Sequence, residues 1–428
     1  MRAFEKRLQS FEVTETSHSL AAYRARGGYG ALAKALRSMK PADVTKEVYD
    51  SGIQGRGGAA FPMGRKWQVV KPDDGLEHFL CANADEGEPG TFKDRWILEN
   101  APHLLLEAMA IACYAIGAHH CFIYLRGEFD LSRRRVEGAL EEAYGAGLLG
   151  ERILGTPFSC DVVLVRGAGA YVCGEASGLL SSVEGKKGYP RNRPPRLTVR
   201  GLFQKPTVIN NVETLSNIPW IIDHGAAAYR ELGTSKSPGT RLISISGHVV
   251  RPGVYEVPFG TPLDELIYED CGGVTGGRAL KAVVPGGIST KVLLANEIAG
   301  LPMDHASLDA AGSSLGSGGM IVIAEGTCMV RLLQVMLRFY HHESCGQCTP
   351  CREGTGWMHR IVDRIAAGRG AAGDIDRLIH VSHFNDGTTI CGLGDAAGYA
   401  TVGILDKFRD EFEHFVAHGR SRCGGSLA

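Results

Sequence analysis

Four cysteines in the C-terminal part of the chain have the spacing of a metal-cluster site. Cys345, Cys348 and Cys351 follow the pattern C-x2-C-x2-C, and Cys391 stands alone further along the chain. Three thiolates from one loop and a fourth from another element can hold a [4Fe-4S] cluster, and Gly346 lets the backbone pass close to inorganic sulfide. The pattern predicts a cluster and therefore electron transfer. Zinc is the alternative, although zinc sites of four cysteines usually pair two C-x2-C sequences.

The other cysteines do not share this spacing. Seven stand singly in mostly apolar runs, where a free thiol packs as a small hydrophobe; they are Cys81, Cys113, Cys121, Cys160, Cys173, Cys271 and Cys328. Cys423 lies in a Gly-rich tail and is expected to be a free surface thiol. Residues 1–7 lead into a polar stretch without the apolar core of a signal peptide, so we expect a reducing, cytoplasmic setting.

Length and composition narrow the class of protein. A chain of 428 residues is expected to form two to four domains. It has no run of about 18 apolar residues, so we expect a soluble protein without a membrane span. The net charge of −1 provides no basic field for nucleic acid. The 57 glycines cluster at turns, which suits close approach of the backbone to a nucleotide.

The elements that must position these residues change in type along the chain. The first 235 residues alternate helices with short apolar strands, which is typical of an α/β layer fold. Helices are expected at 104–117, 132–147 and 175–183, and strands at 121–125 and 161–165.

A second region, residues 236–328, begins at a polar linker and predicts a small β-grasp-like domain. Its expected strands are 242–246, 253–257, 282–284 and 320–323, with a helix at 263–268. Residues 329–428 are then predicted to be helical, at 330–341, 352–367, 375–383 and 395–415. Both cysteine segments therefore precede helices, whose N-terminal dipoles would partly offset the negative charge of a tetrathiolate cluster.

A cluster cannot accept a hydride, so we searched the α/β region for a two-electron site. Residues 55–67, GRGGAAFPMGRKW, can present successive backbone N–H groups to a phosphate, and Lys66 adds a mobile cation. The segment is not a Rossmann fingerprint, because no G-x-G-x-x-G follows a strand. A plain turn is the alternative.

Two further segments carry acids and amides. Residues 83–95, NADEGEPGTFKDR, follow an apolar strand, and acids at such a strand end can accept hydrogen bonds from sugar hydroxyls and a carboxamide. The alternative is a solvated acidic loop. Residues 167–175, GAGAYVCGE, open a helix, and Asn210 and Asn211 follow later with donors and acceptors for a flavin edge or ribityl chain.

Five motifs in order, GRGGAAFP, NADEGEPGTFKDR, GAGAYVCGE, NNVET and SCGQCTPCREG, give the chain a family resemblance. It resembles the NADH-oxidising flavoprotein subunit of respiratory complex I and its relatives in NAD-linked hydrogenases, formate dehydrogenases and aldehyde oxidoreductases. The resemblance implies a flavin- and NAD-binding α/β domain at 1–235, a ubiquitin-like β-grasp domain at 236–328 and a helical domain at 329–428 carrying one [4Fe-4S] cluster.

The same resemblance implies the site residues. The cofactor-binding residues would be Gly55, Arg56, Gly57, Phe61, Lys66, Asn83, Asp85, Tyr171, Gly174, Glu175, Asn210, Asn211 and Thr214. Glu86 and Glu88 would be the catalytic residues that face the nicotinamide nucleotide. Phe61 would stack on that nucleotide, and Glu88 would hold its carboxamide.

Three departures from the family pattern lie at the outer nucleotide pocket. Ala176 replaces a second acid, Arg196 stands where a Phe usually follows the Pro-Pro pair, and Val69 replaces an aromatic residue. FMN and NAD(H) are the default cofactors. Loss of a carboxylate and gain of an Arg give the hypothesis that NADP(H) is admitted. A second hypothesis is that FAD replaces FMN.

The predicted function is an NAD(P)H:flavin oxidoreductase subunit that exchanges single electrons with a [4Fe-4S] cluster and partner subunits. One alternative is the NAD+-reducing diaphorase module of a soluble formate dehydrogenase, hydrogenase or tungsten/molybdenum aldehyde oxidoreductase. An iron–sulfur electron-wiring scaffold without nucleotide chemistry is the alternative from another class. The expected partners are a thioredoxin-like [2Fe-2S] protein or a polyferredoxin, and neither nucleic acid nor a membrane.

Overall fold

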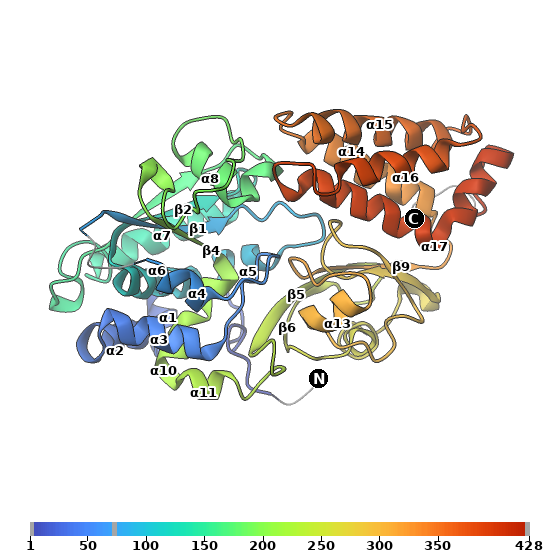
Figure 1. Ribbon diagram of the computed structural model, residues 1–428. Coiled ribbons are helices and arrows are strands. Elements are labelled where there is room, and N and C mark those ends of the chain that lie inside the picture. The colour runs from blue at the N-terminus through green and yellow to red at the C-terminus, as the bar shows by residue number, and fades with distance from the viewer. Residues whose placement is uncertain (1–3, 71–74, 424–428) are drawn as a thin grey trace.

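The computed structural model describes residues 4–70 and 75–423. The first three residues of the N-terminal polar stretch, residues 71–74 and the end of the Gly-rich tail, residues 424–428, lie outside it. The chain forms an α/β part, a second sheet and a helical bundle (Figure 1). The bundle, in orange and red, lies beside both other parts. The predicted fold class is confirmed.

A four-stranded parallel sheet is the centre of the α/β part. Its order is β3-β2-β1-β4, with β1 at His78–Ala84, β2 at Ala118–Leu125, β3 at Asp161–Arg166 and β4 at Thr207–Asn211. Asn83 pairs in register with Asn211, so two amide side chains meet where β1 and β4 end. Because β1 pairs with β2 on one side and β4 on the other, the chain order reverses there, and ligands bind at such points of open α/β sheets.

Alternate residues of β1 face two different cores. Leu80 and Ala82 pack into a core with α6, while Phe79 and Cys81 pack into a core that includes α8 and the helical bundle. The strand side chains alternate between the faces, so both faces of the parallel sheet are covered. The helices of this part are α1 Leu20–Ala25, α2 Gly30–Ser38, α3 Pro41–Ser51, α4 Met63–Gln68, α5 Lys93–Asn100, α6 Pro102–Ile116, α7 Asp130–Gly145, α8 Ala176–Val183, α9 Val212–Ser216, α10 Ile218–His224 and α11 Ala226–Tyr229.

The second sheet is mixed, with the order β6-β5-β9-β7-β8. Its central pair, β5 and β9, is parallel, and the other neighbours are antiparallel. This confirms the β-grasp-like prediction. Its elements are β5 Thr240–Gly247, β6 Gly253–Pro258, β7 Leu280–Val284, β8 Leu293–Leu294, β9 Gly319–Ala324, α12 Leu263–Glu265, a π-helix at Leu266–Asp270 and α13 His305–Ala310.

The C-terminal bundle comprises α14 Met329–Glu343, α15 Thr349–Ala366, α16 Asp374–Asn385 and α17 Gly392–His418. Cys348 and Cys391 are the N-cap residues of α15 and α17, as the sequence predicted. Among the described residues, none of the helices combines the length and apolar character that crossing a bilayer requires. The domain boundaries at 235/236 and 328/329 stay predictions.

The remaining cysteines mostly follow expectation. All seven that were predicted to be core residues are buried. Cys423 is half-buried and packs against the core of the bundle, so it is less exposed than predicted. The tail that carries it folds back onto α17, where Arg422 pairs with Asp410 at 2.7 Å.

An N-terminal segment joins the first two parts. The backbone N–H groups of Arg7, Leu8 and Gln9 donate to the Glu256 carboxylate at 2.9, 2.9 and 2.7 Å, and the Thr240 hydroxyl donates to it at 2.6 Å. Glu256 is 2% exposed on the edge strand β6. One buried carboxylate therefore accepts four hydrogen bonds and ties the segment to the second sheet.

We expect Glu256→Ala to lower the free energy of unfolding by roughly 3–5 kcal/mol, because several buried donors lose their acceptor together. Chemical denaturation followed by circular dichroism measures the change. Glu269→Gln, an exposed acid of the same part, is the control and should stay within about 0.5 kcal/mol of wild type. Equal stability of the two variants would contradict the role assigned to Glu256.

Candidate functional site

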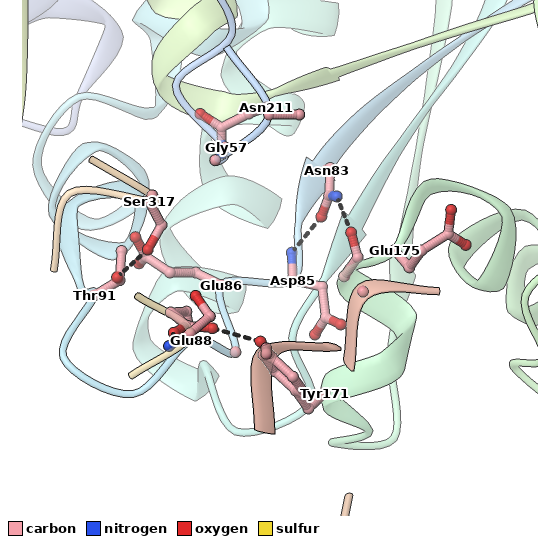
Figure 2. Close-up of a pocket in the computed structure, with 18 of the residues that line it drawn as sticks. Gly57, Asn83, Asp85, Glu86, Glu88, Thr91, Tyr171, Glu175, Asn211 and Ser317 are labelled. Carbon is pink, nitrogen blue, oxygen red and sulfur yellow. Dashed lines mark hydrogen bonds between the residues drawn. The ribbon is translucent and has the colours of Figure 1, made fainter. Parts of the chain in front are cut away.

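A cavity of about 460 Å³ opens where β1 and β4 end, and all three parts of the chain line it. Figure 2 shows the acidic loop after β1 facing Tyr171 on one side and the Gly57 loop with Asn211 on the other. The lining residues that bear on the argument are Gly57, Gly58, Asn83, Asp85, Glu86, Glu88, Lys93, Asp94, Tyr171, Gly174, Glu175, Asn211, Ser289, Ser317, Cys391 and Leu393. Ten of the residues predicted from sequence thus come together here.

The Gly-rich loop approaches the end of β4 closely. A Cβ on Gly57 would lie 3.2 Å from the Asn211 Cβ, so a larger residue would push the loop away from the strand. The Arg56 N–H donates to the Thr214 hydroxyl at 2.8 Å and fixes the loop from behind. The loop therefore presents its backbone to the cavity at a fixed height above β4.

Arg56 itself does not line the cavity. Its side chain is fully buried and donates to the Tyr229 hydroxyl and the Thr240 carbonyl, both at 3.1 Å, while its plane covers the Phe259 ring. The guanidinium is committed to joining the loop to the second sheet. The sequence prediction of a cofactor-binding Arg56 therefore finds its side chain outside the cavity.

Five other predicted residues also lie outside the lining: Gly55, Phe61, Lys66, Asn210 and Thr214. Lys66 donates to the Ile209 carbonyl at 2.6 Å, and burial, together with nearby Arg193, lowers the Lys66 pKa to about 8. Asn210 accepts a hydrogen bond from Trp67 at 3.1 Å. Phe61 is 50% exposed and free to meet a ligand.

The first polar residues after β1 are fixed by the turn that follows β3. The Asn83 amide donates to the Gly174 carbonyl at 2.8 Å, and its oxygen accepts from the Asp85 N–H at 3.1 Å. Asp85 is 7% exposed, and its Oδ2 has no hydrogen-bond partner among the described residues. Burial raises the pKa of Asp85 to about 7.

The two predicted catalytic acids differ in how they are held. Glu86 accepts from the N–H groups of Asp94 and Arg95 at 2.9 and 3.0 Å, so it caps α5. Burial, with the neighbouring Asp94 charge, raises the Glu86 pKa to about 7. Glu88 accepts from the Ser289 N–H at 2.8 Å and from the Tyr171 hydroxyl (Figure 2). Burial raises the Glu88 pKa as well.

A buried cation also lines the cavity, and the sequence reasoning assigned it no role. Lys93 is 1% exposed, and its Nζ lies 2.8 Å from Asp94, 2.9 Å from Glu213 and 3.4 Å from Asn211. Burial lowers the pKa of Lys93, but these carboxylates raise it further, so the amine stays charged. Its signal was a Lys-Asp pair at the start of α5, inside the quoted acidic motif.

Two serines from the second sheet were missed entirely. Ser289 holds Glu88, and the Ser317 hydroxyl lies 2.5 Å from the Thr91 hydroxyl. Neither serine belongs to a recognisable motif. Only the packing of the second sheet against the α/β part brings them to the cavity.

Glu175 is the N-cap residue of α8, one residue before the helix that the sequence placed from this position. It accepts from the N–H groups of Ser177 and Gly178 at 2.8 and 2.9 Å, and the Arg193 guanidinium donates to it at 2.9 Å. Arg193 and Arg196 are both exposed beside this acid. The edge of the cavity near α8 is therefore basic.

The four predicted metal ligands share the core of the helical bundle; Cys351 is buried, and Cys345, Cys348 and Cys391 are half-buried. Burial raises the pKa of Cys351 to about 12 and that of Cys391 to about 11, and the other cysteines of the set add to both shifts. The four thiols are thus close enough to repel one another as thiolates. A bound cationic metal centre would be needed to keep them ionised.

The spacing of the sulfurs separates a cluster from a single zinc ion. In a tetrahedral zinc site the sulfurs lie about 3.8 Å apart, because each Zn–S bond is about 2.3 Å. Among the described residues, Cys113, Cys121 and Cys160 have ligand atoms within 4.8 Å of one another, whereas no three of the four cluster cysteines do. The wider set suits the corners of a cubane.

The cysteine site and the cavity share a wall. Cys391 lines the cavity, and Glu343, just before the Cys345 loop, accepts from the Tyr171 N–H at 3.0 Å. The Tyr171 ring packs edge-on against Phe339 of α14, with centroids 5.1 Å apart. The arrangement therefore joins a nucleotide-sized cavity directly to a tetrathiolate site, which defines a flavin- and iron–sulfur-dependent oxidoreductase.

Comparison with known families gives the same class. The chain matches the Nuo51 FMN-binding domain over residues 48–220, the SLBB domain over 241–323 and the NADH-ubiquinone oxidoreductase-F iron-sulfur binding region over 331–415. It is 49% identical over 405 residues to an F-type NADH-quinone oxidoreductase chain of Rhizobium meliloti (strain 1021), covering 95% of each chain. It is 48% identical over 396 residues to the corresponding F-type chain of Mycobacterium tuberculosis (strain ATCC 25618 / H37Rv), covering 92% of this chain and 88% of the relative.

A solved structure is also similar. An NAD+-reducing [NiFe]-hydrogenase in the H2-reduced state superposes with a TM-score of 0.81 at 36% identity, covering 90% of this chain and 66% of that chain. The chain belongs to the family of F-type NADH-quinone oxidoreductase subunits. It is an NADH dehydrogenase flavoprotein that uses FMN and a [4Fe-4S] cluster, as predicted, and a subunit of a larger NADH-oxidising complex or hydrogenase.

Proposed function

We propose that the cavity holds FMN with the nicotinamide of NADH above it, and that Cys345, Cys348, Cys351 and Cys391 hold the cluster. The observation that carries the proposal is the shared wall, where Cys391 lines the same cavity as the acidic loop. Bound FMN supplies the chemistry of accepting two electrons as a hydride and releasing them singly. The chain's own residues bind and orient the reactants.

The flavin is held by the loops at the ends of β1 and β4. The N–H groups around Gly57 and the buried Lys93 amine offer positive charge to the phosphate. Asn83 and Asn211 supply amide groups at the sheet edge. Lys66 lies behind β4 and adds a cation that burial has brought near neutrality. These contacts fix the cofactor without any covalent bond.

The nicotinamide nucleotide enters on the side of Glu88 and Phe61. Glu88 is held in place by Ser289 and Tyr171, so its carboxylate is oriented before the substrate arrives. It accepts the carboxamide N–H, and the exposed Phe61 ring stacks on the nucleotide. Glu86 supports this loop by capping α5. Positioning of this kind supplies much of the rate acceleration of hydride transfer.

The partners follow from the cluster. Electrons leave or enter through the half-exposed cysteines, so an iron–sulfur partner docks at the bundle; a thioredoxin-like [2Fe-2S] protein or a polyferredoxin has the required chemistry. The superposed hydrogenase is named as NAD+-reducing, which supports the alternative that this chain is a diaphorase module running toward NAD+. The match to an FMN-binding family supports FMN over FAD.

A second candidate concerns the nucleotide. Arg193 neutralises Glu175, Ala176 carries no acid, and Arg196 is exposed beside them, which favours acceptance of a 2′-phosphate. NADP(H) is therefore the alternative substrate of the same site.

Anaerobic mixing with NADH or NADPH tests the proposed function. We expect NADH to bleach the flavin absorbance within the turnover time. A kcat/KM for NADPH within about tenfold of that for NADH would support the second candidate, and a preference for NADH above about 1000-fold would exclude it. Failure of both nucleotides to reduce the flavin would contradict the proposed function.

A further inference from the structure

Asp85 is the cavity acid that the proposed mechanism leaves without a chemical role. We propose that the Asp85 carboxylate binds one proton from water when the site receives electrons and releases it when the electrons leave. The inference rests on the proposed function, because it requires electrons to enter this cavity. It assigns the redox-linked proton of the site to one atom, Asp85 Oδ2.

The geometry sets this carboxyl group apart from its neighbours. Its backbone is fixed on both sides, since the Asp85 N–H donates to Asn83 at 3.1 Å and the Gly87 N–H donates to the Asp85 carbonyl at 2.9 Å. Its Oδ2 is buried without a partner among the described residues and belongs to a residue that lines the cavity (Figure 2). Glu86 and Glu88 each accept two hydrogen bonds instead.

The charges around Asp85 do not neutralise it. Arg126 is the nearest cation, but it donates to the Glu86 carbonyl at 2.7 Å and pairs with Glu128 at 3.2 Å. The groups that face Asp85 from the packed elements are Arg126 and Glu128 after β2, Tyr124 of β2, Cys173 of the turn and Glu343 of α14. Two of the three charged groups are acids. A desolvated carboxylate in such surroundings holds a proton more tightly than in water, in accord with its pKa of about 7.

The charge balance of the reaction supplies the driving force. A hydride carries two electrons and one proton, so its arrival adds one negative charge to the cavity. That charge favours formation of an O–H bond at Oδ2, with the proton taken from water. When both electrons have passed on singly, the negative charge is gone, the O–H bond breaks and the proton returns to water. Asp85 thereby keeps the cavity near constant charge.

The pH window follows from the sign of this coupling. Below about pH 7 Asp85 is already protonated before reduction, so reduction adds no proton to it. Reduction raises the Asp85 pKa further, so proton uptake at this residue appears above pH 7. At still higher pH it disappears again, once the carboxyl stays ionised in both states.

Proton uptake on reduction tests the assignment directly. The whole protein, in weak buffer with a pH-indicating dye, is reduced anaerobically by light and a sacrificial donor, so that no nucleotide is needed. At about pH 8 we expect wild type to take up close to one proton per flavin more than Asp85→Asn. Glu128→Gln removes an exposed acid of the same wall and should behave as wild type. Equal uptake by wild type and Asp85→Asn between pH 6 and 9 would overturn the assignment.

An infrared measurement on wild type keeps the test decisive if Asp85→Asn loses its flavin. The reduced-minus-oxidised spectrum at pH 8 should gain a protonated-carboxyl band that shifts in protein grown with carboxyl-labelled aspartate. Absence of an aspartate band would overturn the assignment as well. Failure of NADH to bleach the flavin in wild type would instead contradict the proposed function, so the two failures are distinguishable.

Discussion

Replacing Cys348 with alanine is expected to remove the cluster and leave the flavin site in place. The four cysteines share the core of the bundle, and a cubane that loses one thiolate corner is not retained by the other three. We expect the iron content to fall by about four per chain. NADH should still bleach the flavin absorbance, because the loops at the ends of β1 and β4 are untouched. Metal analysis and absorbance spectra measure both quantities.

Cys423→Ala is the matched control for this prediction. Cys423 is also half-buried in the same core but lies outside the set of four. Its substitution should leave the iron content unchanged. If C348A kept its iron, or if C423A lost it, the assignment of the ligands would be wrong.

Replacing Glu88 with glutamine is expected to lower kcat/KM for NADH about 10- to 100-fold, mainly through KM. The glutamine is nearly isosteric, but it loses the charge that accepts hydrogen bonds from Ser289, Tyr171 and the proposed carboxamide. A hydrogen bond to a charged group contributes about 1.5–3 kcal/mol, which corresponds to this range. Steady-state kinetics with NADH measure the effect, and flavin content shows whether the cofactor is retained.

Glu128→Gln provides the comparison for Glu88. Glu128 is an exposed acid that pairs with Arg126 outside the cavity lining. Its kcat/KM should stay within about twofold of wild type. An unchanged KM in Glu88→Gln would contradict the role of this carboxylate in nucleotide binding.

Local sequence signals predicted the elements well where periodicity was strong. The buried helix expected at 104–117 is α6, Pro102–Ile116, because nearly every side chain in it is apolar. The last helix begins earlier than predicted, since its first residues, Gly392 and Gly394, have poor helix propensity. A Cβ on Gly394 would lie 3.1 Å from the Cys351 Cβ, so close packing against the cysteine loop overrides propensity there.

The site was predictable only where one motif supplies both backbone and side chain. The acidic loop after β1 fits this description, and Asn83, Asp85, Glu86 and Glu88 all line the cavity. Arg56 does not, because its partners Tyr229 and Thr240 lie far along the chain and draw its side chain into an interface. No local pattern encodes such a contact.

The contribution of the second sheet could not be predicted from the sequence for the same reason. Ser289 reaches Glu88 across a separation of 201 residues, through packing between two sheets. The same packing brings Ser317 beside Thr91. The catalytic cavity is therefore a product of the whole chain, although its chemistry could be read from short motifs.

The shared wall between the cavity and the four cysteines is the centre of this account, and one measurement tests it most directly. Wild-type protein is titrated anaerobically with NADH while absorbance follows the flavin and electron paramagnetic resonance follows the cluster. We predict that bleaching of the flavin is accompanied by the paramagnetic signal of a reduced [4Fe-4S] cluster, and that this signal is missing in C348A. A bleached flavin beside a cluster that stays oxidised in excess NADH would contradict the account.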